Sequence, residues 1–357
     1  MNRIVLKPTC LVFSHREDEH LAAVLRLIPG EDVPFVVDTR DFGSSFAATV
    51  DIREAVESYL RLRSGEVVSL CSLKSIWWRR PAGVLLDPGI PKQMRAFVEN
   101  ERTLFIAGLL ASVPPWVRQY NSPSSQQRID SKLYQIQLAK SVGLRVPNTC
   151  VTSDPSAARA FLMQSERCIF KSFWGTHEFW QPTRLLTPEL ATHLDHLVAC
   201  PSILQDYIDG EFEIRATVID EDIHAAAFDL RHSRYPADVR IDTRLPCRPF
   251  DLPDGIGDGL KRLMKAAEIR YGAFDLRLTK DGDFVFLEVN PAGQFLYIDI
   301  QAGTRIVETM ARALCRDVVD HPNLARTELN RICDGSPLPS IEPLPFAAIG
   351  PDIRHLP

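Results

Sequence analysis

The 357-residue sequence lacks the features that mark several common classes of protein. Its eight cysteines include no C-x-x-C pair, which argues against a zinc cluster and is typical of reduced thiols in the cytoplasm. No uninterrupted apolar run reaches about 18 residues and the first residues form no signal peptide, so we expect a cytoplasmic protein without a transmembrane helix. There is also no G-x-S-x-G motif and no evident Cys/His pair, so we expect no protein nucleophile.

A strong charge of one sign is also missing. The formal net charge is -5, which gives no global electrostatic reason to expect binding to nucleic acid or to a membrane surface. Hydrophobic residues make up 45% of the chain and charged residues 24%, as in ordinary globular proteins. The length is sufficient for two or three compact units, each with its own core.

Hydrophobic periodicity and turn signals predict an N-terminal α/β unit, two further α+β lobes around a cleft, and a Pro-rich tail. The predicted boundaries of these four parts are 1–122, 123–204, 205–320 and 321–357. The expected strands cover 10–14, 34–40, 67–73, 75–81, 150–153, 168–173, 202–208, 211–220 and 224–230, with 67–73 and 75–81 able to pair. The expected helices cover 17–28, 92–110, 129–142, 155–164, 188–198, 255–268 and 303–314, and a Gly-centred turn is expected at 174–178.

The stretch 271–294 is predicted to form two antiparallel strands, because Asp281-Gly282 between runs of alternating apolar residues is a strong hairpin signal. We expect a two-residue turn that pairs Lys280 with Asp283. Period-2 alternation then separates an apolar face from a face that can hold ligands. The expected apolar side carries Phe274, Leu276, Leu278, Val285, Leu287 and Val289, and the opposite side carries Asp275, Arg277, Phe286, Glu288 and Asn290.

This register places two carboxylates face to face. Asp275 falls opposite Glu288, and Ala273 falls opposite Asn290, with directly opposed side chains sharing one face of the sheet. Two carboxylates in this position repel each other unless a cation lies between them, and magnesium binds through one or two carboxylates plus substrate phosphates. A surface hairpin whose acids point at water is the alternative.

Three basic residues have neighbours that suit phosphate binding. Lys132 lies at the start of an expected helix, and Lys171 lies inside an apolar strand, where a buried ammonium needs a partner. Arg215 shares a strand face with Glu211 and Glu213, in a position suited to bidentate contact with phosphate. An exposed lysine and a surface salt bridge are the alternatives, and each residue taken alone does not decide between them.

Two further basic segments have no partner that can be read from the sequence. The stretch 231–248 contains five arginines, and we expect an exposed loop that grips an anionic substrate or, alternatively, is merely solvated. Its candidate substrate-binding residues are Arg231, Arg234, Arg240 and Arg244. The Trp77-Trp78 pair is predicted to pack in a core, but the Arg79-Arg80 pair that follows it is less easily explained.

Taken together, these segments resemble the ATP-grasp fold in their order and spacing. Lys132 after an Asn-Ser-Pro turn, Lys171 on a strand, and QDYIDGEFEIRATVI are similar to the nucleotide-binding elements of the ribosomal-modification-type ligases. The segment GAFDLRLTKDGDFVFLEVNPAGQF is similar to their metal-binding hairpin. More closely, SIWWRRP and LEVNPAGQF resemble the microviridin-type ligases, which are ATP-grasp macrocyclases that cross-link ribosomal peptides, the graspetides. The likeness covers Leu11 to Cys315.

The resemblance implies an N-terminal pre-grasp domain, two lobes that enclose ATP, and two magnesium ions. The implied positions are Lys132 and Lys171 at the phosphates, Gln205, Asp206, Tyr207 and Ile208 at the adenine, Glu211 or Glu213 at the ribose, Arg215 at the γ-phosphate and the reacting carboxylate, and Asp275, Glu288 and Asn290 at the magnesium ions.

The implied reaction is the activation of an Asp or Glu side chain of a ribosomal precursor peptide as an acyl phosphate, followed by closure of an ω-ester or ω-amide ring. The implied partner is a peptide with a leader and an acidic core, and the relatives suggest a homodimer. Two alternatives stay open. One is an ATP-grasp ligase that adds a free amino acid to a protein or small acid, and the other is a non-catalytic ATP-binding regulatory protein.

Overall fold

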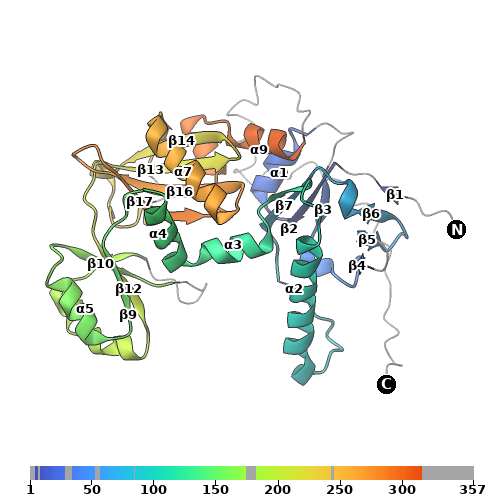
Figure 1. Ribbon diagram of the computed structural model, residues 1–357, viewed down its shortest axis with the longest axis horizontal. Helices are drawn as coiled ribbons and strands as arrows, with labels where there is room; N and C mark the ends of the chain where they lie inside the picture. The colour runs from blue at the N-terminus through green and yellow to red at the C-terminus, as the bar shows by residue number, and fades with distance from the viewer. Residues whose placement is uncertain are drawn as a thin grey trace.

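The computed structural model describes residues 5–6, 9–28, 34–52, 57–83, 85–173, 182–242 and 245–315. These residues form four β-sheets with helices packed between and around them (Figure 1). The mixed α/β class predicted from the sequence is confirmed. The expected turn at 174–178 and the Pro-rich tail at 321–357 lie outside the described residues.

A parallel sheet organises the N-terminal part of the chain. Its strand order is β3 (Phe35–Val37), β2 (Cys10–Ser14), β7 (Ser75–Arg80) and β8 (Arg118–Tyr120). Every residue of the central strand β2 is buried, as expected for a parallel strand covered on both faces. The helices here are α1 (Glu19–Leu25) and α2 (Arg95–Ala111), and a short 3-10 helix (Lys92–Met94) precedes α2.

A second, mixed sheet accompanies the first. Its order is β1 (Val5–Leu6), β6 (Val67–Ser69), β5 (Glu57–Leu62) and β4 (Phe46–Asp51). The predicted pairing of 67–73 with 75–81 is therefore wrong, because β6 pairs with β5 whereas β7 pairs with β2 in the other sheet. The 3-10 helix Leu70–Ser72 separates the two strands and redirects the chain.

The third sheet forms a small lobe in the middle of the chain. Its order is β11 (Arg184–Leu185), β10 (Cys168–Lys171), β12 (Ser202–Asp206) and β9 (Thr149–Thr152). Its helix α5 (Pro155–Leu162) packs with Cys168 and Leu204 in a core of its own. The helix predicted at 188–198 is two shorter pieces, α6 (Pro188–Ala191) and a 3-10 helix (Leu194–Val198).

The fourth sheet is antiparallel and contains the predicted hairpin. Its order is β15 (Cys247–Phe250), β14 (Asp222–Asp229), β13 (Phe212–Ile219), β16 (Tyr271–Leu278) and β17 (Phe284–Asn290). The helices of this region are α3 (Pro123–Asp130), α4 (Lys132–Ser141), α7 (Asp254–Ala267), α8 (Leu296–Ala302) and α9 (Ile306–Leu314). No helix within the described ranges has both the length and the apolar character needed to cross a bilayer.

Both faces of the fourth sheet are covered. On one face Ile214, Val218 and Phe274 pack against α7, α4 and α3. On the other face Ala226 and Phe228 share a core with α8, α9, α1 and residues of the first parallel sheet. Figure 1 shows α1 and α9 side by side where these two parts of the molecule meet. A continuous apolar core therefore joins the N-terminal sheet to the sheet that carries the hairpin.

The helix predicted over 129–142 is split at Ser131. The backbone of Ser131 is extended, with φ of -66° and ψ of 110°, so α3 ends before it and α4 begins at Lys132. Serine favours this position because its hydroxyl can accept a hydrogen bond from the first turn. The split fixes Lys132 as the first residue of a helix, as predicted, with its side chain near the hairpin.

The tip of the hairpin differs from its prediction. The amide of Gly282 donates to the carbonyl of Thr279 (3.1 Å), and Gly282 has a φ of +85°, which glycine tolerates without strain. The amide of Thr279 donates to the carbonyl of Asp283 (2.9 Å), so the loop has three residues. The predicted pair of Lys280 with Asp283 is wrong by one residue.

A β-bulge restores the predicted register nearer the end of the sheet. The pairing shifts by one residue between Asp275 and Leu276, which leaves Leu287 as the extra residue of β17. Beyond the bulge Asp275 pairs with Glu288, and the prediction that they lie opposite each other is confirmed.

The bulge also exchanges the faces of two residues. Phe286 lies opposite Leu276 and is buried in the core beneath α7, whereas Val285 lies opposite Arg277. The predicted placement of Val285 on the core face and Phe286 on the ligand face is therefore wrong. Val289, which lies beyond the bulge, is in the core as predicted.

The small lobe offers a test of local stability. Asp154 caps α5 by accepting a hydrogen bond from the amide of Ser156 (2.8 Å), and loss of such a cap typically costs about 1 kcal/mol. In the Asp154→Ala variant we expect about fivefold faster amide hydrogen exchange in α5. The exposed Glu166→Ala change in the same lobe is the control, and equal exchange in both variants would contradict the capping role.

Candidate active site

Three charged side chains lie in one row across β13, β16 and β17. Arg215 is opposite Asp275, and Asp275 is opposite Glu288, so the three share a face of the sheet. Nη1 of Arg215 donates to both carboxylate oxygens of Asp275, at 2.7 and 2.8 Å. The sequence predicted the two acids together and placed Arg215 on a ligand-bearing face, but not the contact between the arginine and Asp275.

The row continues onto helix α4. Nζ of Lys132 lies 2.6 Å from Oε2 of Glu288, so each of the two carboxylates has a cationic partner. We call Arg215, Asp275, Glu288 and Lys132 the charged row. Their side chains are between 11% and 23% exposed, which excludes the alternative of acids that simply point at water. Charges this sheltered are screened by salt less than exposed pairs are.

The environment of Arg215 keeps it charged. Burial by itself lowers the pKa of the Arg215 guanidinium, but Asp275 and the nearby Tyr297 and Tyr271 together outweigh burial and hold that pKa above its ordinary value. The site therefore contains a permanently positive guanidinium, suited to contact with anionic oxygens.

A second ion pair lies in the neighbouring row of the same sheet. Glu213 is opposite Arg277, and Nη2 of Arg277 donates to Oε2 of Glu213 at 2.9 Å. Both residues are buried, and burial raises the pKa of the Glu213 carboxyl above its usual range although Arg277 opposes that shift. Glu211, by contrast, is only partly buried and precedes the first residue of β13.

The three predicted magnesium ligands are brought to one end of the hairpin. Asn290 is exposed and lies opposite Ala273, two residues beyond Glu288 on the same face. The carboxylates of Asp275 and Glu288 and the amide oxygen of Asn290 are the hard oxygen donors that magnesium prefers. Within the described ranges no group of three or more His, Cys, Asp or Glu side chains could hold a metal ion, so phosphate oxygens would have to complete this donor set. The donor set therefore fits magnesium carried by a phosphate ligand.

The loop after β17 packs directly against Arg215. The hydroxyl of Tyr271 donates to the carbonyl of Gly293 (2.8 Å), and Nη2 of Arg215 lies 3.5 Å from the carbonyl of Gln294. A Cβ on Gly293 would lie 2.4 Å from Cβ of Ala273 and 2.8 Å from Nη2 of Arg215. Only glycine lets the loop approach the sheet this closely.

The Gly293→Ala variant is expected to displace Arg215 or the loop, because the added methyl group has no space. Overpacking of this kind typically costs about 1–3 kcal/mol. We therefore expect the free energy of unfolding to fall by about 1–3 kcal/mol, measured by denaturant titration. Gly108→Ala, in helix α2 with nothing within 4 Å of the added Cβ, is the control, and equal free energies of unfolding in both variants would contradict the close approach.

The predicted nucleotide-binding residues of the small lobe lie at the ends of its strands. Gln205 is buried on β12, and its Nε2 donates to Oγ1 of Thr149 (2.8 Å). Lys171 is the last residue of β10 and is partly buried. The other members of the predicted set, Asp206, Tyr207 and Ile208, form the end of β12 and the start of the segment that leads to β13.

Tyr207 and Asp206 each have a fixed neighbour in this segment. The guanidinium of Arg167 lies over the ring of Tyr207, 4.3 Å from its centroid. Oδ2 of Asp206 accepts a hydrogen bond from Asn148 (2.7 Å). The segment between the small lobe and β13 is thus held in place at both side chains.

The basic stretch is only partly a loop. Arg231 donates to Asp229 through Nε and Nη2 (2.9 and 2.7 Å), and Arg234 is exposed. The side chain of Arg240 and all of Arg244 lie outside the described residues. The predicted loop contains residues of two short 3-10 helices, Leu230–His232 and Val239–Ile241. It is also wrong for its last two residues, because Cys247 and Arg248 begin the edge strand β15, which pairs with β14.

Two buried amide side chains near the site were not predicted from the sequence. Asn121 donates to the carbonyls of Tyr271 and Pro291, at 2.9 and 3.0 Å. Gln135 donates to the carbonyl of Val289 (2.8 Å) and accepts from its amide (3.1 Å). Both hold the backbone of the hairpin from outside the sheet. In the sequence Gln135 lies between Tyr134 and Ile136 and Asn121 lies in a polar stretch, and neither context identifies a partner.

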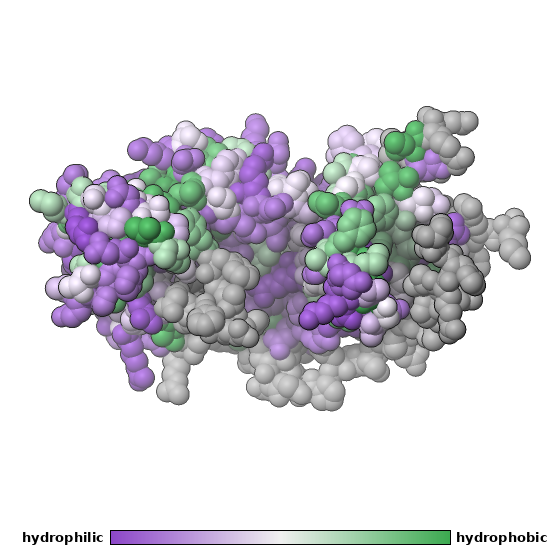
Figure 2. Space-filling view, turned by 90° about the horizontal axis from the view of Figure 1, so that it is seen from below, coloured by the Kyte–Doolittle hydropathy of each residue, from purple (hydrophilic) through white to green (hydrophobic). Residues whose placement is uncertain are grey.

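One face of the molecule has a polar recess. Figure 2 shows a recess lined by hydrophilic residues between the part of the molecule that carries α5 and the part that carries α2. A surface of this kind favours a charged ligand over an apolar one.

Comparison with solved structures places this geometry in a known fold. A RiPP-associated ATP-grasp ligase of Chryseobacterium gregarium, solved in complex with ADP and a leader and core peptide, matches with a TM-score of 0.75 and 22% identity over 87% of this chain and 97% of that chain. The macrocyclase MdnC from Microcystis aeruginosa MRC, bound with precursor peptide MdnA, matches with a TM-score of 0.74 and 26% identity over 88% and 100%. MdnB from the same organism matches with a TM-score of 0.67 and 24% identity over 88% and 100%.

These similarities confirm the predicted ATP-grasp fold and the predicted resemblance to the ligases that modify ribosomal peptides. Neither a protein-family model nor a curated protein sequence matches the chain. The roles assigned to individual residues and the domain boundaries at 122, 204 and 320 stay predictions.

Proposed function

We propose that this chain, which has the fold of the ATP-grasp ligases that modify ribosomal peptides, is an ATP-dependent peptide macrocyclase of the graspetide type. The observation that carries the proposal is the charged row, in which two sheltered carboxylates and two cations converge from three strands and a helix. Phosphoryl transfer needs positioning and charge stabilisation rather than a protein nucleophile, so the lack of a nucleophile motif agrees with it.

The reaction has two steps. In the first, a side-chain carboxylate oxygen of the peptide bonds to the γ-phosphorus of ATP while the bond from that phosphorus to the β,γ-bridging oxygen breaks and ADP leaves. In the second, a Ser or Thr hydroxyl or a Lys amine of the same peptide bonds to the carbonyl carbon of the acyl phosphate and loses a proton. The bond from that carbon to the phosphate oxygen breaks, inorganic phosphate leaves, and an ester or amide ring closes. The net change in the peptide is the loss of one water per ring.

We propose that the charged row stabilises the negative charge on the phosphate oxygens in the first step. Asp275, Glu288 and Asn290 would hold two magnesium ions, which neutralise charge on the phosphate oxygens when bound. Magnesium at these carboxylates would leave donor groups of Arg215 and Lys132 available for anionic oxygens. We propose that Arg215 then contacts the γ-phosphoryl group and the reacting carboxylate, and that Lys132 contacts the phosphates.

The nucleotide would lie between the small lobe and the antiparallel sheet. We propose Lys171 as a second phosphate ligand and the segment Gln205 to Ile208 as the adenine-binding edge. Glu211 suits the ribose better than Glu213 does, because Glu213 is buried and paired with Arg277. The boundaries at 122, 204 and 320 would then separate the pre-grasp domain and the two lobes that enclose ATP.

The peptide partner is proposed to have a leader and an acidic core. Arg231 and Arg234, with Arg240 and Arg244, would attract its carboxylates. We also propose a homodimer in the cytoplasm. The free thiols of the cysteines in the described ranges agree with a reducing compartment.

Co-expression with short reading frames rich in Thr, Asp and Glu near the gene tests the function directly. We expect mass spectrometry to show successive losses of water from one such peptide, and ADP to form only when that peptide is present. A gain in mass equal to an amino-acid residue would favour the ligase that adds a free amino acid. Binding of ATP without ADP formation in the presence of any peptide tested would favour a regulatory protein.

A further inference from the structure

A shift in strand register changes the direction of the Arg79 side chain in the parallel sheet. Phe13 pairs with Trp78 and Ser14 pairs with Arg80, so Arg79 is the extra residue where the register of β2 and β7 shifts. A bulge of this kind turns a side chain away from its regular direction. The Arg79 side chain is 1% exposed, so its positive charge needs partners within the protein.

The guanidinium of Arg79 reaches across to the loop that follows β17. Nη1 of Arg79 donates to the carbonyl of Ala292 at 2.7 Å and to the carbonyl of Gly293 at 2.9 Å. Its carbon Cζ lies 5.5 Å from the ring centroid of Phe295, close enough for a cation–π contact. A residue of the N-terminal sheet thus fixes two consecutive carbonyls more than two hundred positions away in the chain.

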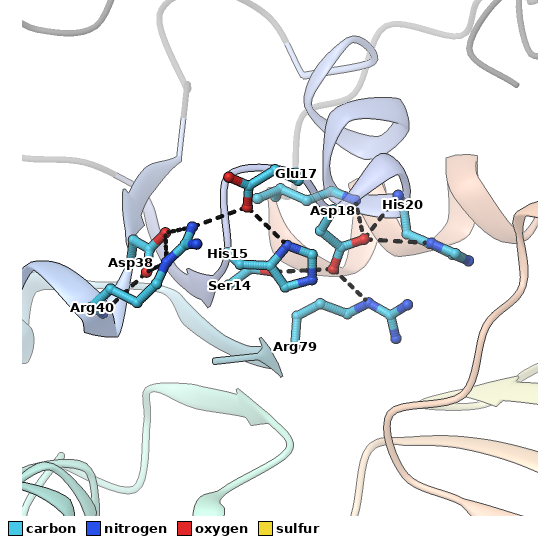
Figure 3. A network of polar contacts seen from close by, with 9 residues as sticks. Ser14, His15, Glu17, Asp18, His20, Asp38, Arg40 and Arg79 are labelled. Carbon is cyan, nitrogen blue, oxygen red and sulfur yellow. Dashed lines mark hydrogen bonds and ion pairs between the residues drawn. The ribbon is translucent and has the colours of Figure 1, made fainter. Parts of the chain in front are cut away.

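Asp18 holds Arg79 from the other side. Oδ2 of Asp18 lies 3.2 Å from Nε of Arg79, and Ser14 donates to the same oxygen (3.0 Å). Figure 3 shows Asp18 at the start of α1 between Arg79 and His20. Burial raises the pKa of the Asp18 carboxyl, but hydrogen bonding to His20 and the charge of Arg79 hold that pKa well below its usual value, so the residue is a carboxylate.

The loop that Arg79 holds is continuous with the candidate magnesium site. The amide of Ala292 donates to Oδ1 of Asn290 at 3.0 Å, which orients the Asn290 side chain. Gly293 packs so closely on Arg215 that a Cβ there would lie 2.8 Å from Nη2 of the arginine. One residue of the loop therefore contacts Asn290 and the next contacts Arg215, and both accept hydrogen bonds from Arg79.

We propose that Asp18 and Arg79 are positioning residues, by which the N-terminal sheet sets the geometry of Asn290 and Arg215 at the magnesium site. This inference rests on the proposed function. Asp18 orients Arg79, Arg79 fixes the carbonyls of Ala292 and Gly293, and the fixed loop presents the amide oxygen of Asn290 to the metal.

A role limited to stability would give a different result from a positioning role. Loss of stability alone lowers the fraction of folded protein but leaves the magnesium dependence of the folded fraction unchanged. Loss of positioning raises the magnesium concentration needed, because residues behind a ligand typically change metal affinity by about 10–100-fold. The measurement is therefore the affinity for the ATP analogue AMPPNP as a function of magnesium concentration, by calorimetry.

Two conservative variants test the pair. Arg79→Lys keeps a positive charge but lacks the planar guanidinium, in which Nε faces Asp18 while Nη1 donates to the two carbonyls. Asp18→Asn keeps the shape and the helix cap but removes the charge. In both we expect the magnesium concentration for half-maximal AMPPNP binding to rise about tenfold, with metal-free AMPPNP binding within about twofold of the unsubstituted protein.

Asp38→Asn is the matched control. Asp38 is as buried as Asp18. Each of the two carboxylates accepts a hydrogen bond from the backbone amide two residues later, and each pairs with an arginine, which for Asp38 is Arg40 (Figure 3). Among the described residues, the hydrogen bonds and ion pair of Asp38 do not reach the loop at 291–294, so we expect the magnesium dependence of this variant to be unchanged. Circular dichroism checks that each variant is folded.

The magnesium dependence of AMPPNP binding distinguishes a failure of the positioning role from a failure of the proposed function. Unchanged magnesium dependence in both Arg79→Lys and Asp18→Asn would overturn the inference, as would an equal shift in Asp38→Asn. If only one of the two variants folds, that variant decides. No magnesium-dependent AMPPNP binding by the unsubstituted protein would instead refute the proposed function, and the inference with it.

Discussion

Replacement of Arg215 by alanine is expected to lower kcat by about 10²–10³-fold. Arg215 is sheltered, permanently charged and held against Asp275, so it is fixed before any substrate binds. Removal of one such preorganised donor typically costs about 2.7–4 kcal/mol of transition-state stabilisation. The rate of ADP formation is measured over a single turnover, and the modified peptide is detected by mass spectrometry. The KM for ATP is expected to change less than kcat.

A matched arginine just outside the same pair of strands controls for the loss of an ion pair. Arg270 donates to Oδ1 of Asp220 (2.7 Å) near the opposite end of β13 and is about half exposed. Arg270→Ala is expected to retain turnover within about twofold, since exposed pairs contribute little. Turnover by Arg215→Ala at the level of the control would contradict the role proposed for Arg215.

The Glu288→Gln variant is expected to lose most of its magnesium-dependent activity. Glutamine has the shape of glutamate but lacks the charge that a divalent cation needs, and Lys132 would lose its carboxylate partner. We expect turnover at low magnesium to fall about 100-fold or more, because even residues behind a ligand change metal affinity by about 10–100-fold. ADP formation measured across a magnesium titration checks this, with partial recovery expected at high magnesium.

Glu268→Gln removes the same charge from an exposed pair and serves as the control. Glu268 accepts a hydrogen bond from Arg128 (2.9 Å) at the end of α7, outside the charged row. We expect the control to need the same magnesium concentration as the unsubstituted protein. If Glu288→Gln behaved in the same way, Glu288 would not be a metal ligand.

The opposition of Asp275 and Glu288 could be predicted although the turn was not. The number of residues between the two acids is fixed by the sequence. A two-residue turn with a regular ladder and a three-residue turn with a bulge use that same number, so both give the same pairing near the site. The exchange of Val285 and Phe286 could not be predicted, since only the position of the bulge decides which face each one takes.

The contacts that join distant parts of the chain could not be predicted either. Lys132 and Glu288 are separated by 156 positions, and Arg79 and Ala292 by 213. Local periodicity determines which face of a strand or helix is apolar, but not which of several such faces meet. The same limit explains the wrong pairing of 67–73 with 75–81. The two strands follow one another in the sequence, but they belong to different sheets.

The bulge at Leu287 has a consequence for how the hairpin tolerates changes in length. A residue removed from the loop between Thr279 and Asp283 would leave a two-residue connection of a common type, with every pair of the ladder retained. A residue removed at Leu287 would make the ladder regular. In either case Asp275 would still face Glu288, so related chains with shortened hairpins can keep the same pair of acids in alignment.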